Sequence, residues 1–533
     1  MLINNLVNAF FENQKKYLIL ILIEALKIHN YNNRTFLNSN LMKKLSFFIL
    51  LAISFTACSK KVYVAEWVST TEITPWKKED IKTRSANKSV ATVAIYTDKA
   101  LQKIEGFGSC LNELGWTSLS QLSDTDRDAI MKELYEPNTG ANFTIARMPI
   151  GANDFSRDWY SYDETDFDYN LDNFSIANDK QTLVPFIKAA EKYNPKLNLW
   201  ASPWSPPQWM KYNKHYALNK VPDMIKNAEN GIEDSQIGKE GQDMFIQTDR
   251  YFASYALYFK KFIEAYKAEN ITIAMVMPQN EFNSAQWYPS CTWTPEGLSK
   301  FIAHLGPEMD KMGVKVFFGT LERPKAQLFE EAYKTSSKYI KGVGLQWAGK
   351  EAIADIHKAH PNLTIYQSEH ECGDGKNNWD YTVYSWDLMK HYLLNGANAY
   401  LYWNTSLLKG GISRWGWTQN SLVTVDTENK TYAWNHEYYL MKHLSHYVKP
   451  GATLLQTSSA AAINHRNDVL GWWEGNLSSN ADNLLAFKNT DGSVAVIVYN
   501  TTDAVKQMSF SVGKTVMNPV VAAKSFNTFL IKK

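Results

Sequence analysis

The chain has 533 residues, of which 45% are hydrophobic and 21% are charged, and these shares are close to those of ordinary globular proteins. They exclude the low-complexity, collagen-like and fully disordered classes. Fifty-six basic and 54 acidic residues give a net charge of +2, so the charge does not indicate a nucleic-acid partner. Four cysteines in a chain of this length are too few for a disulfide scaffold.

The first sixty residues predict export of the protein. Lys43 and Lys44 precede an apolar stretch over 45–57, and Cys58 follows it. A basic start and a short apolar run are typical of a secretory signal, and about 13 apolar residues fall short of the roughly 20 that a membrane-spanning helix needs.

The end of that stretch, Phe55-Thr56-Ala57-Cys58, resembles a bacterial lipobox. We therefore expect 42–57 to be a lipoprotein signal peptide and Cys58 to become the lipidated first residue of an exported bacterial lipoprotein, anchored to a membrane in the periplasm or at the cell surface. The alternative is an uncleaved anchor followed by an ordinary buried cysteine. Residues 1–41 are expected to lie upstream of the true start and are excluded from the fold prediction.

From residue 104 onward, eight short apolar runs alternate with segments of helical length. Ser123 followed by Asp126 has the spacing of a helix N-cap, Thr294-Pro295 is typical of a helix start, and 183–190 has helical apolar periodicity. This alternation predicts a (β/α)₈ barrel over 104–446, and a doubly wound sheet is disfavoured because no G-x-G-x-x-G follows the first run. The expected strands are Ile104–Gly108, Phe143–Met148, Leu197–Ser202, Ile271–Met277, Val314–Gly319, Gly342–Trp347, Leu363–Gln367 and Ala397–Trp403.

Both ends of the mature chain have the pattern of β-strands. Residues 62–103 contain the runs Val62–Val68 and Ser89–Tyr96, and in 447–533 the runs 484–487 and 494–499 flank a turn. Because neither end alone has enough strands to be stable, we expect them to form one accessory β-sandwich.

In a barrel of this kind the active site lies at the carboxyl ends of the strands, so polar residues at those ends are candidates for chemistry. Glu281 follows the fourth expected strand and Glu369 follows the seventh. Two facing carboxyl groups, one protonated and one ionised, are what hydrolysis of a glycosidic bond requires. The alternative is that each glutamate is a surface residue or a partner in an ion pair.

Other strand ends carry residues that fit the same pocket. Arg147 could hold a nearby carboxylate ionised or form a structural ion pair under the rim. Trp204, Trp347 and Trp403 each follow a strand, and although one such tryptophan usually belongs to the core, three at one rim favour stacking on a sugar ring. No cofactor is expected, and no metal either, because the neighbours in 369–372 are too close in sequence to ligate one ion comfortably.

The chain resembles glycoside hydrolase family 30, in the clan A barrel hydrolases that include the lysosomal glucosylceramidases. The segments that carry the resemblance are 104–109, 147–151 with 154–156, 202–210, 278–281, 368–369, 437–443 and 448–452.

The resemblance implies a retaining double displacement in which Glu281 is the acid/base and Glu369 is the nucleophile. It implies that Asn280 binds the sugar 2-hydroxyl, that Asp154, Trp204 and Trp403 line the glycone site, and that a β-sandwich accompanies the barrel. The expected partner is therefore a β-glucoside or β-glucan substrate.

Two departures from the family pattern bear on Glu369. Where glucosylceramidases carry His-Trp-Tyr after the sixth strand, this chain has Gln346-Trp347-Ala348, so another group must orient Glu369. Glu371 offers a second carboxylate two residues later, but we expect it to lie past the strand.

Three functions stay open at this point: a glucosylceramidase-like β-glucosidase, an endo-β-1,6-glucanase of the same family, and a non-catalytic tethered glycan-binding lipoprotein. The sequence does not distinguish exo from endo action or indicate an oligomeric state.

Overall fold

The computed structural model describes residues 62–80, 91–465 and 476–532. The expectations for 1–41, for the signal peptide over 42–57 and for Cys58 therefore lie outside the described residues, as does the start of the strand expected over 89–96. Within the described ranges, no helix combines the length and the apolar character needed to cross a membrane.

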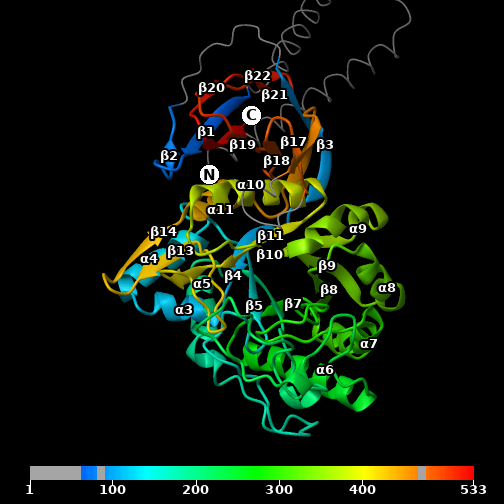
Figure 1. Ribbon diagram of the computed structural model, residues 1–533. Coiled ribbons are helices and arrows are strands. Elements are labelled where there is room, and N and C mark those ends of the chain that lie inside the picture. The colour runs from blue at the N-terminus through cyan, green and yellow to red at the C-terminus, as the bar shows by residue number, and fades with distance from the viewer. Residues whose placement is uncertain (1–61, 81–90, 466–475, 533) are drawn as a thin grey trace, which may run out of the picture. The chain divides into compact units, whose positions relative to one another are not determined.

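The centre of the fold is a closed barrel in which every neighbouring pair of strands is parallel (Figure 1). This confirms the predicted (β/α)₈ architecture, and each expected strand overlaps an observed one with ends that differ by no more than two residues. The strands are β4 (Gly106–Cys110), β5 (Ile145–Pro149), β6 (Asn198–Ser202), β7 (Ile273–Val276), β8 (Lys315–Leu321), β9 (Ile340–Gln346), β10 (Thr364–Glu369) and β11 (Ala399–Asn404).

Helices follow most of these strands, and the predicted helix starts are confirmed. The Ser123 side chain accepts a hydrogen bond from the Asp126 backbone N–H, and Thr294 caps a helix that begins with Pro295. The helices are α3 (Glu113–Leu119), α4 (Asp124–Tyr135), α5 (Leu183–Glu191), α6 (Asp249–Ala268), α7 (Pro295–Met312), α8 (Ala326–Ser336), α9 (Ile353–Ala359), α10 (Trp379–Leu394) and α11 (His436–Ser445), with short 3₁₀ turns η1 (Asp179–Gln181), η2 (Gln208–Met210), η3 (Asp234–Gln236) and η4 (Trp347–Ala352).

Large side chains from several strands fill the inside of the barrel. Trp200, Phe317, Tyr366 and Leu401 belong to one buried cluster there. Gly344 of β9 makes room for this packing, because a Cβ at that position would lie 2.4 Å from the sulfur of Met277. The interior is therefore a packed core, and chemistry is confined to the ends of the strands.

A second β-structure is built from both ends of the described chain. Its nine-stranded sheet has the order β2-β1-β24-β19-β18-β15-β3-β21-β22. Phe510 of β21 and Phe529 of β24 are far apart in that order, yet their ring centroids are 5.5 Å apart, so the sheet folds back into two facing layers. This confirms the predicted sandwich and its hairpin of β18 and β19. The remaining strands are β1 (Tyr63–Thr70), β2 (Lys77–Lys78), β3 (Val93–Lys103), β12 (Ser406–Leu408), β13 (Val423–Asp426), β14 (Thr431–Trp434), β15 (Thr453–Thr457), β16 (Ala461–His465), β17 (Asn476–Asn480), β18 (Leu484–Lys488), β19 (Val494–Asn500), β20 (Lys506–Gln507), β21 (Phe510–Val512), β22 (Thr515–Met517), β23 (Val520–Val521) and β24 (Ser525–Lys532).

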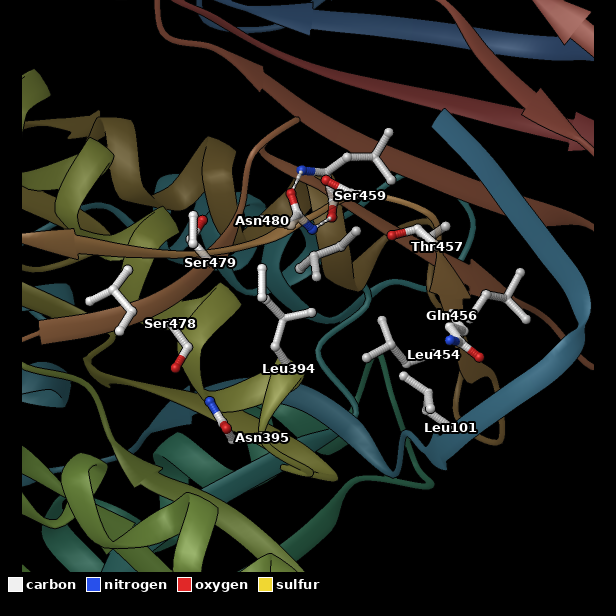
Figure 2. A pocket seen from close by; sticks show the side chains of 17 residues that line it. Leu101, Leu394, Asn395, Leu454, Gln456, Thr457, Ser459, Ser478, Ser479 and Asn480 are labelled. Atoms are coloured by element: carbon white, nitrogen blue, oxygen red, sulfur yellow. Dashed lines mark hydrogen bonds between the residues drawn. The ribbon is translucent and has the colours of Figure 1, made fainter. Parts of the chain in front are cut away.

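A surface pocket of about 740 Å³ lies between the sandwich strands β15–β18 and the end of α10 (Figure 2). Its lining is mostly leucine and alanine, with the polar side chains of Asn395, Ser459 and Asn480 among them. Because α10 leads into the start of β11, this pocket lies at the end of the barrel where the strands begin. It is therefore separate from the strand ends that carry the candidate glutamates.

Candidate active site

Glu281 lies on the loop that leaves β7, and the backbone there holds it in an uncommon conformation. Its φ angle is +46°, in the left-handed region. The backbone N–H of Glu281 donates to the Thr320 hydroxyl at 2.9 Å, and the preceding residue, Asn280, donates its own N–H to the Pro203 carbonyl at 2.7 Å. Contacts with the neighbouring strand ends therefore position the carboxyl group.

Glu369 is the last residue of β10, and three donors from β5, the end of β9 and the start of η4 surround its carboxylate. Arg147 donates through Nη1 to Oε2 at 2.7 Å, and both side chains are buried. Gln346 donates through Nε2 to the same oxygen at 3.0 Å, and the indole N–H of Trp347 donates to Oε1 at 3.2 Å. These three donors orient Glu369 in place of the tyrosine that the sequence lacks.

Gln346 also joins the two glutamates. Its Nε2 lies 3.3 Å from Glu281 Oε1 and 3.0 Å from Glu369 Oε2. Because both oxygens contact one nitrogen, they are at most about 6.3 Å apart. The structure thus brings the two predicted carboxyl groups together.

The Arg147 guanidinium links three further strand ends. Its Nη2 donates to Asn280 Oδ1 at 2.7 Å and to the Ser202 hydroxyl at 2.9 Å. Its central carbon lies 4.5 Å from the ring centroid of Trp204 and 5.5 Å from that of Trp403. Arg147 therefore forms a buried ion pair with Glu369 and opposes the rise that burial causes in the pKa of that carboxyl group.

The tryptophans at the strand ends have two different roles. Trp204 and Trp403 stack on each other with centroids 5.3 Å apart, and each is only 1% exposed, so together they form a closed wall of the site. Trp347 is partly exposed and binds Glu369. All three predicted tryptophans thus lie around Arg147 and Glu369.

Two buried polar atoms near these residues have no hydrogen-bond partner within the described part of the chain. They are Oδ1 of Asp154 and Nε1 of Trp403. Buried polar atoms are nearly always paired in native proteins, so these two are the atoms of the site that a further hydrogen-bonding group could satisfy.

The surroundings separate the proton affinities of the two glutamates. Burial raises the pKa of Glu281 well above its usual value, and the charges of Glu322 and Glu369 raise it further. Burial also raises the pKa of Glu369, but the adjacent Arg147 guanidinium and the donated hydrogen bonds oppose that effect. Burial therefore favours the protonated form of both carboxyl groups, and only at Glu369 does an adjacent guanidinium oppose it.

The neighbours of Glu369 in sequence point away from the pair. Glu371 lies past the end of β10, as expected, and pairs with the buried Lys350 at 3.0 Å. His370 lies between the hydroxyls of Tyr400 and Ser385. Among the residues that the structure describes, no group of three or more His, Cys, Asp or Glu side chains is arranged to hold a metal ion.

Sequence reasoning missed two residues of the site. Tyr288 donates its hydroxyl to Glu281 Oε2 at 2.9 Å, and Gln346 was noticed only as a departure from the family pattern. Gln346 could have been found from its place at the end of β9. Tyr288 lies in a loop without periodicity, and no local pattern distinguishes it.

Comparisons with known proteins identify the family of both domains. Residues 104–448 match the TIM-barrel domain of glycosyl hydrolase family 30, and residues 476–529 match the beta sandwich domain of that family. Putative glucosylceramidase 1 of Caenorhabditis elegans is 28% identical over 450 residues, which cover 76% of each chain. The endo-1,6-beta-D-glucanase neg1 of Aspergillus fumigatus is 26% identical over 427 residues, 75% of this chain and 79% of the relative.

The solved structure of the endo-beta1,6-glucanase BT3312 has the same fold, with a TM-score of 0.70 and 24% identity over 88% of this chain and 98% of that one. Two adjoining domains match one family in order, and the matched barrel contains both glutamates. The chain therefore belongs to glycosyl hydrolase family 30 and is a glycoside hydrolase.

Proposed function

We propose that this chain is a retaining β-glycosidase that cleaves β-glucosidic bonds by double displacement through a covalent glycosyl-enzyme. The observation that carries the proposal is the separation of the two carboxyl groups. Retaining enzymes place them about 5–5.5 Å apart, whereas inverting enzymes need about 6.5–9.5 Å to fit a water molecule. The limit of about 6.3 Å between Glu281 Oε1 and Glu369 Oε2 lies below the inverting range.

In the first step, a Glu369 oxygen attacks the anomeric carbon while Glu281 gives its proton to the departing oxygen. The glycosidic C–O bond breaks, and an ester between the sugar and Glu369 forms. In the second step, the Glu281 carboxylate takes a proton from water, whose oxygen attacks the same carbon and releases Glu369. The pKa difference between the two carboxyl groups supports these roles, because the first step needs Glu281 protonated and Glu369 ionised.

The polar groups around the pair suit a sugar in the glycone site. Asn280 uses Oδ1 to accept from Arg147, which leaves its amide nitrogen as the donor toward a 2-hydroxyl. Asp154 Oδ1 and Trp403 Nε1 are the buried atoms that other sugar hydroxyls would satisfy. The relatives named as glucosylceramidases and 1,6-glucanases support glucose in that site.

Substitution of the two glutamates tests the proposal. Glu281→Gln and Glu369→Gln are each expected to lower turnover of an aryl β-glucoside by about a thousandfold or more, since each removes a group that acts in the transition state. The sugar first released by the parent protein should be the β-anomer, as followed by NMR. Thermal unfolding of both variants serves as the control for folding. Hydrolysis by either variant at the parent rate, or release of the α-anomer, would contradict the proposal.

We further propose that the protein is exported and anchored by a lipid on Cys58. The basic start at Lys43-Lys44, the apolar stretch over 45–57 and the lipobox-like end support this. Cys58→Ala should move the protein from the membrane fraction to the soluble fraction, and the parent should incorporate labelled fatty acid. Equal membrane retention of parent and variant would exclude the anchor.

A further inference from the structure

A pair of tryptophans packs against Tyr288, the residue whose hydroxyl binds Glu281. Trp287 is on the loop after β7, and Trp417 is on the loop between β12 and β13. Their ring centroids are 4.9 Å apart with an angle of 36° between the planes. Both are partly exposed, in contrast to the 1% exposure of Trp204 and Trp403 in the wall of the site.

Tyr288 connects this pair to Glu281. Its ring lies 5.5 Å from Trp287 and 6.4 Å from Trp417, and its hydroxyl donates to Glu281 Oε2 at 2.9 Å. The other oxygen, Oε1, faces Gln346, which also binds Glu369. The two tryptophans are therefore linked, through Tyr288, to Oε2 of Glu281, whereas Oε1 is the oxygen that faces Gln346.

Hydrogen bonds hold both tryptophans in place before any ligand arrives. The indole N–H of Trp287 donates to the Trp415 carbonyl at 3.0 Å, which joins the two loops. The Trp417 backbone N–H donates to the Ser413 hydroxyl at 3.1 Å. What these residues offer a ligand is thus a preformed pair of aromatic surfaces.

The polar setting of this pair determines which leaving group fits it. Arg414, on the loop of Trp417, lies 3.5 Å from Asp158, and Arg323, which pairs with Glu240, donates to Ser284 on the loop of Trp287. Partly exposed aromatic faces on loops that also carry charged and hydroxyl side chains suit a sugar ring, which has both C–H faces and hydroxyl edges.

We propose that Trp287 and Trp417 form the subsite for the leaving group and that this subsite takes a second hexopyranose ring. The inference rests on the proposed function and adds to it the chemical class of the group that departs from Glu281. It favours glycan over glycolipid substrates.

The test compares two substrates that differ only in the leaving group. A β-1,6-linked glucobiose needs the subsite, whereas β-glucosyl fluoride has a leaving group too small to reach it. Trp287→Ala and Trp417→Ala should each lower the ratio of kcat/KM for the disaccharide to that for the fluoride by tenfold or more. Because both substrates are measured on one preparation, any misfolded fraction cancels from the ratio.

Two further variants sharpen the comparison. Trp417→Phe keeps an aromatic face and should recover most of the ratio. Trp434→Ala removes a partly exposed tryptophan whose ring lies 3.9 Å from Tyr438 on α11, outside this loop pair, and should leave the ratio unchanged.

Each contrary outcome has a separate meaning. An unchanged ratio in both alanine variants would overturn the subsite. The alanine variants could instead lose kcat/KM for octyl β-glucoside, relative to the fluoride, and not for the disaccharide. That outcome would overturn the sugar assignment in favour of a lipid leaving group, which the exposed Met224 and Ile412 could contact. Failure of the parent to hydrolyse the fluoride would overturn the proposed function and this inference with it.

Discussion

Arg147 makes the two glutamates chemically different although both are buried. It lies 2.7 Å from Glu369, and its remaining donors go to residues such as Ser202 and Asn280. A cation so close favours the ionised form of Glu369, whereas the charges nearest to Glu281 are negative. One buried guanidinium thereby supports a difference in pKa between the proposed acid and the proposed nucleophile. Double displacement requires that difference.

Glu322, just past β8, provides a test of how Glu281 keeps its proton. After burial, its charge is the largest influence that raises the pKa of Glu281. Burial raises the pKa of Glu322 itself to about 7, against the opposing charge of Arg323. Glu322→Gln removes the negative charge, so Glu281 should lose its proton at lower pH. The basic limb of the pH profile of kcat/KM for the disaccharide should move to lower pH.

Glu331, exposed on α8, offers a matched control for that experiment. Glu331→Gln makes the same change of charge and should leave the profile in place. The acidic limb reports Glu369 and should move little in either variant. A basic limb that stays fixed or moves to higher pH in Glu322→Gln would show that Glu322 does not control the acid.

At the scale of elements, the strands were predictable because their signal is local. Each barrel strand is a short apolar run, and β10 ends at the glutamate that the sequence singled out. In a parallel barrel all carboxyl ends meet at one face, so finding the ends also located Arg147, Glu281 and Glu369. Most of the residues that meet in the candidate site could therefore be inferred without coordinates.

The loops were not predictable because their contacts depend on the whole barrel. Trp287 and Trp417 are neighbours in space but lie on loops that leave different strands. The same holds for Gln346, whose amide reaches both glutamates only when β9 and β10 are adjacent. No periodicity in one sequence encodes such pairings.

One sandwich strand shows how tertiary pairing overrides a local signal. The sequence predicts an end at Tyr96, because Thr97, Asp98 and Lys99 are polar, and this prediction is wrong. β3 continues to Lys103, where Lys103 pairs with Thr453 and Ala100 pairs with Leu455 of β15. Backbone hydrogen bonds to a neighbouring strand keep these exposed residues extended.

At the scale of the whole molecule, the sandwich fastens both ends of the described chain to the barrel. His443 of α11 is fully buried, with Nδ1 at 2.8 Å from the Thr528 hydroxyl of β24 and Nε2 at 2.8 Å from the Thr70 hydroxyl of β1. One imidazole thus joins the helix after the barrel to strands from opposite ends of the sequence.

The ionisation of His443 should therefore contribute to the loss of stability in acid, as should that of His370, which is equally buried. Burial lowers its pKa to about 3, whereas a histidine in the unfolded chain titrates near about 6.5. Its contribution to stability is complete above about pH 6.5 and declines as the pH falls toward 3, by up to about 1.4 kcal/mol per pH unit, because only the unfolded chain takes up the proton. His443→Gln cannot ionise, so its thermal midpoint should fall less than that of the parent between pH 7 and pH 4. At pH 7 its free energy of unfolding should already be lower than that of the parent by about 1–2 kcal/mol, because the glutamine makes imperfect hydrogen bonds. The control is His304→Gln, at a partly exposed site on α7, whose thermal midpoint should follow that of the parent across this pH range. If the thermal midpoint of His443→Gln fell as steeply in acid as that of the parent, other groups would govern acid unfolding.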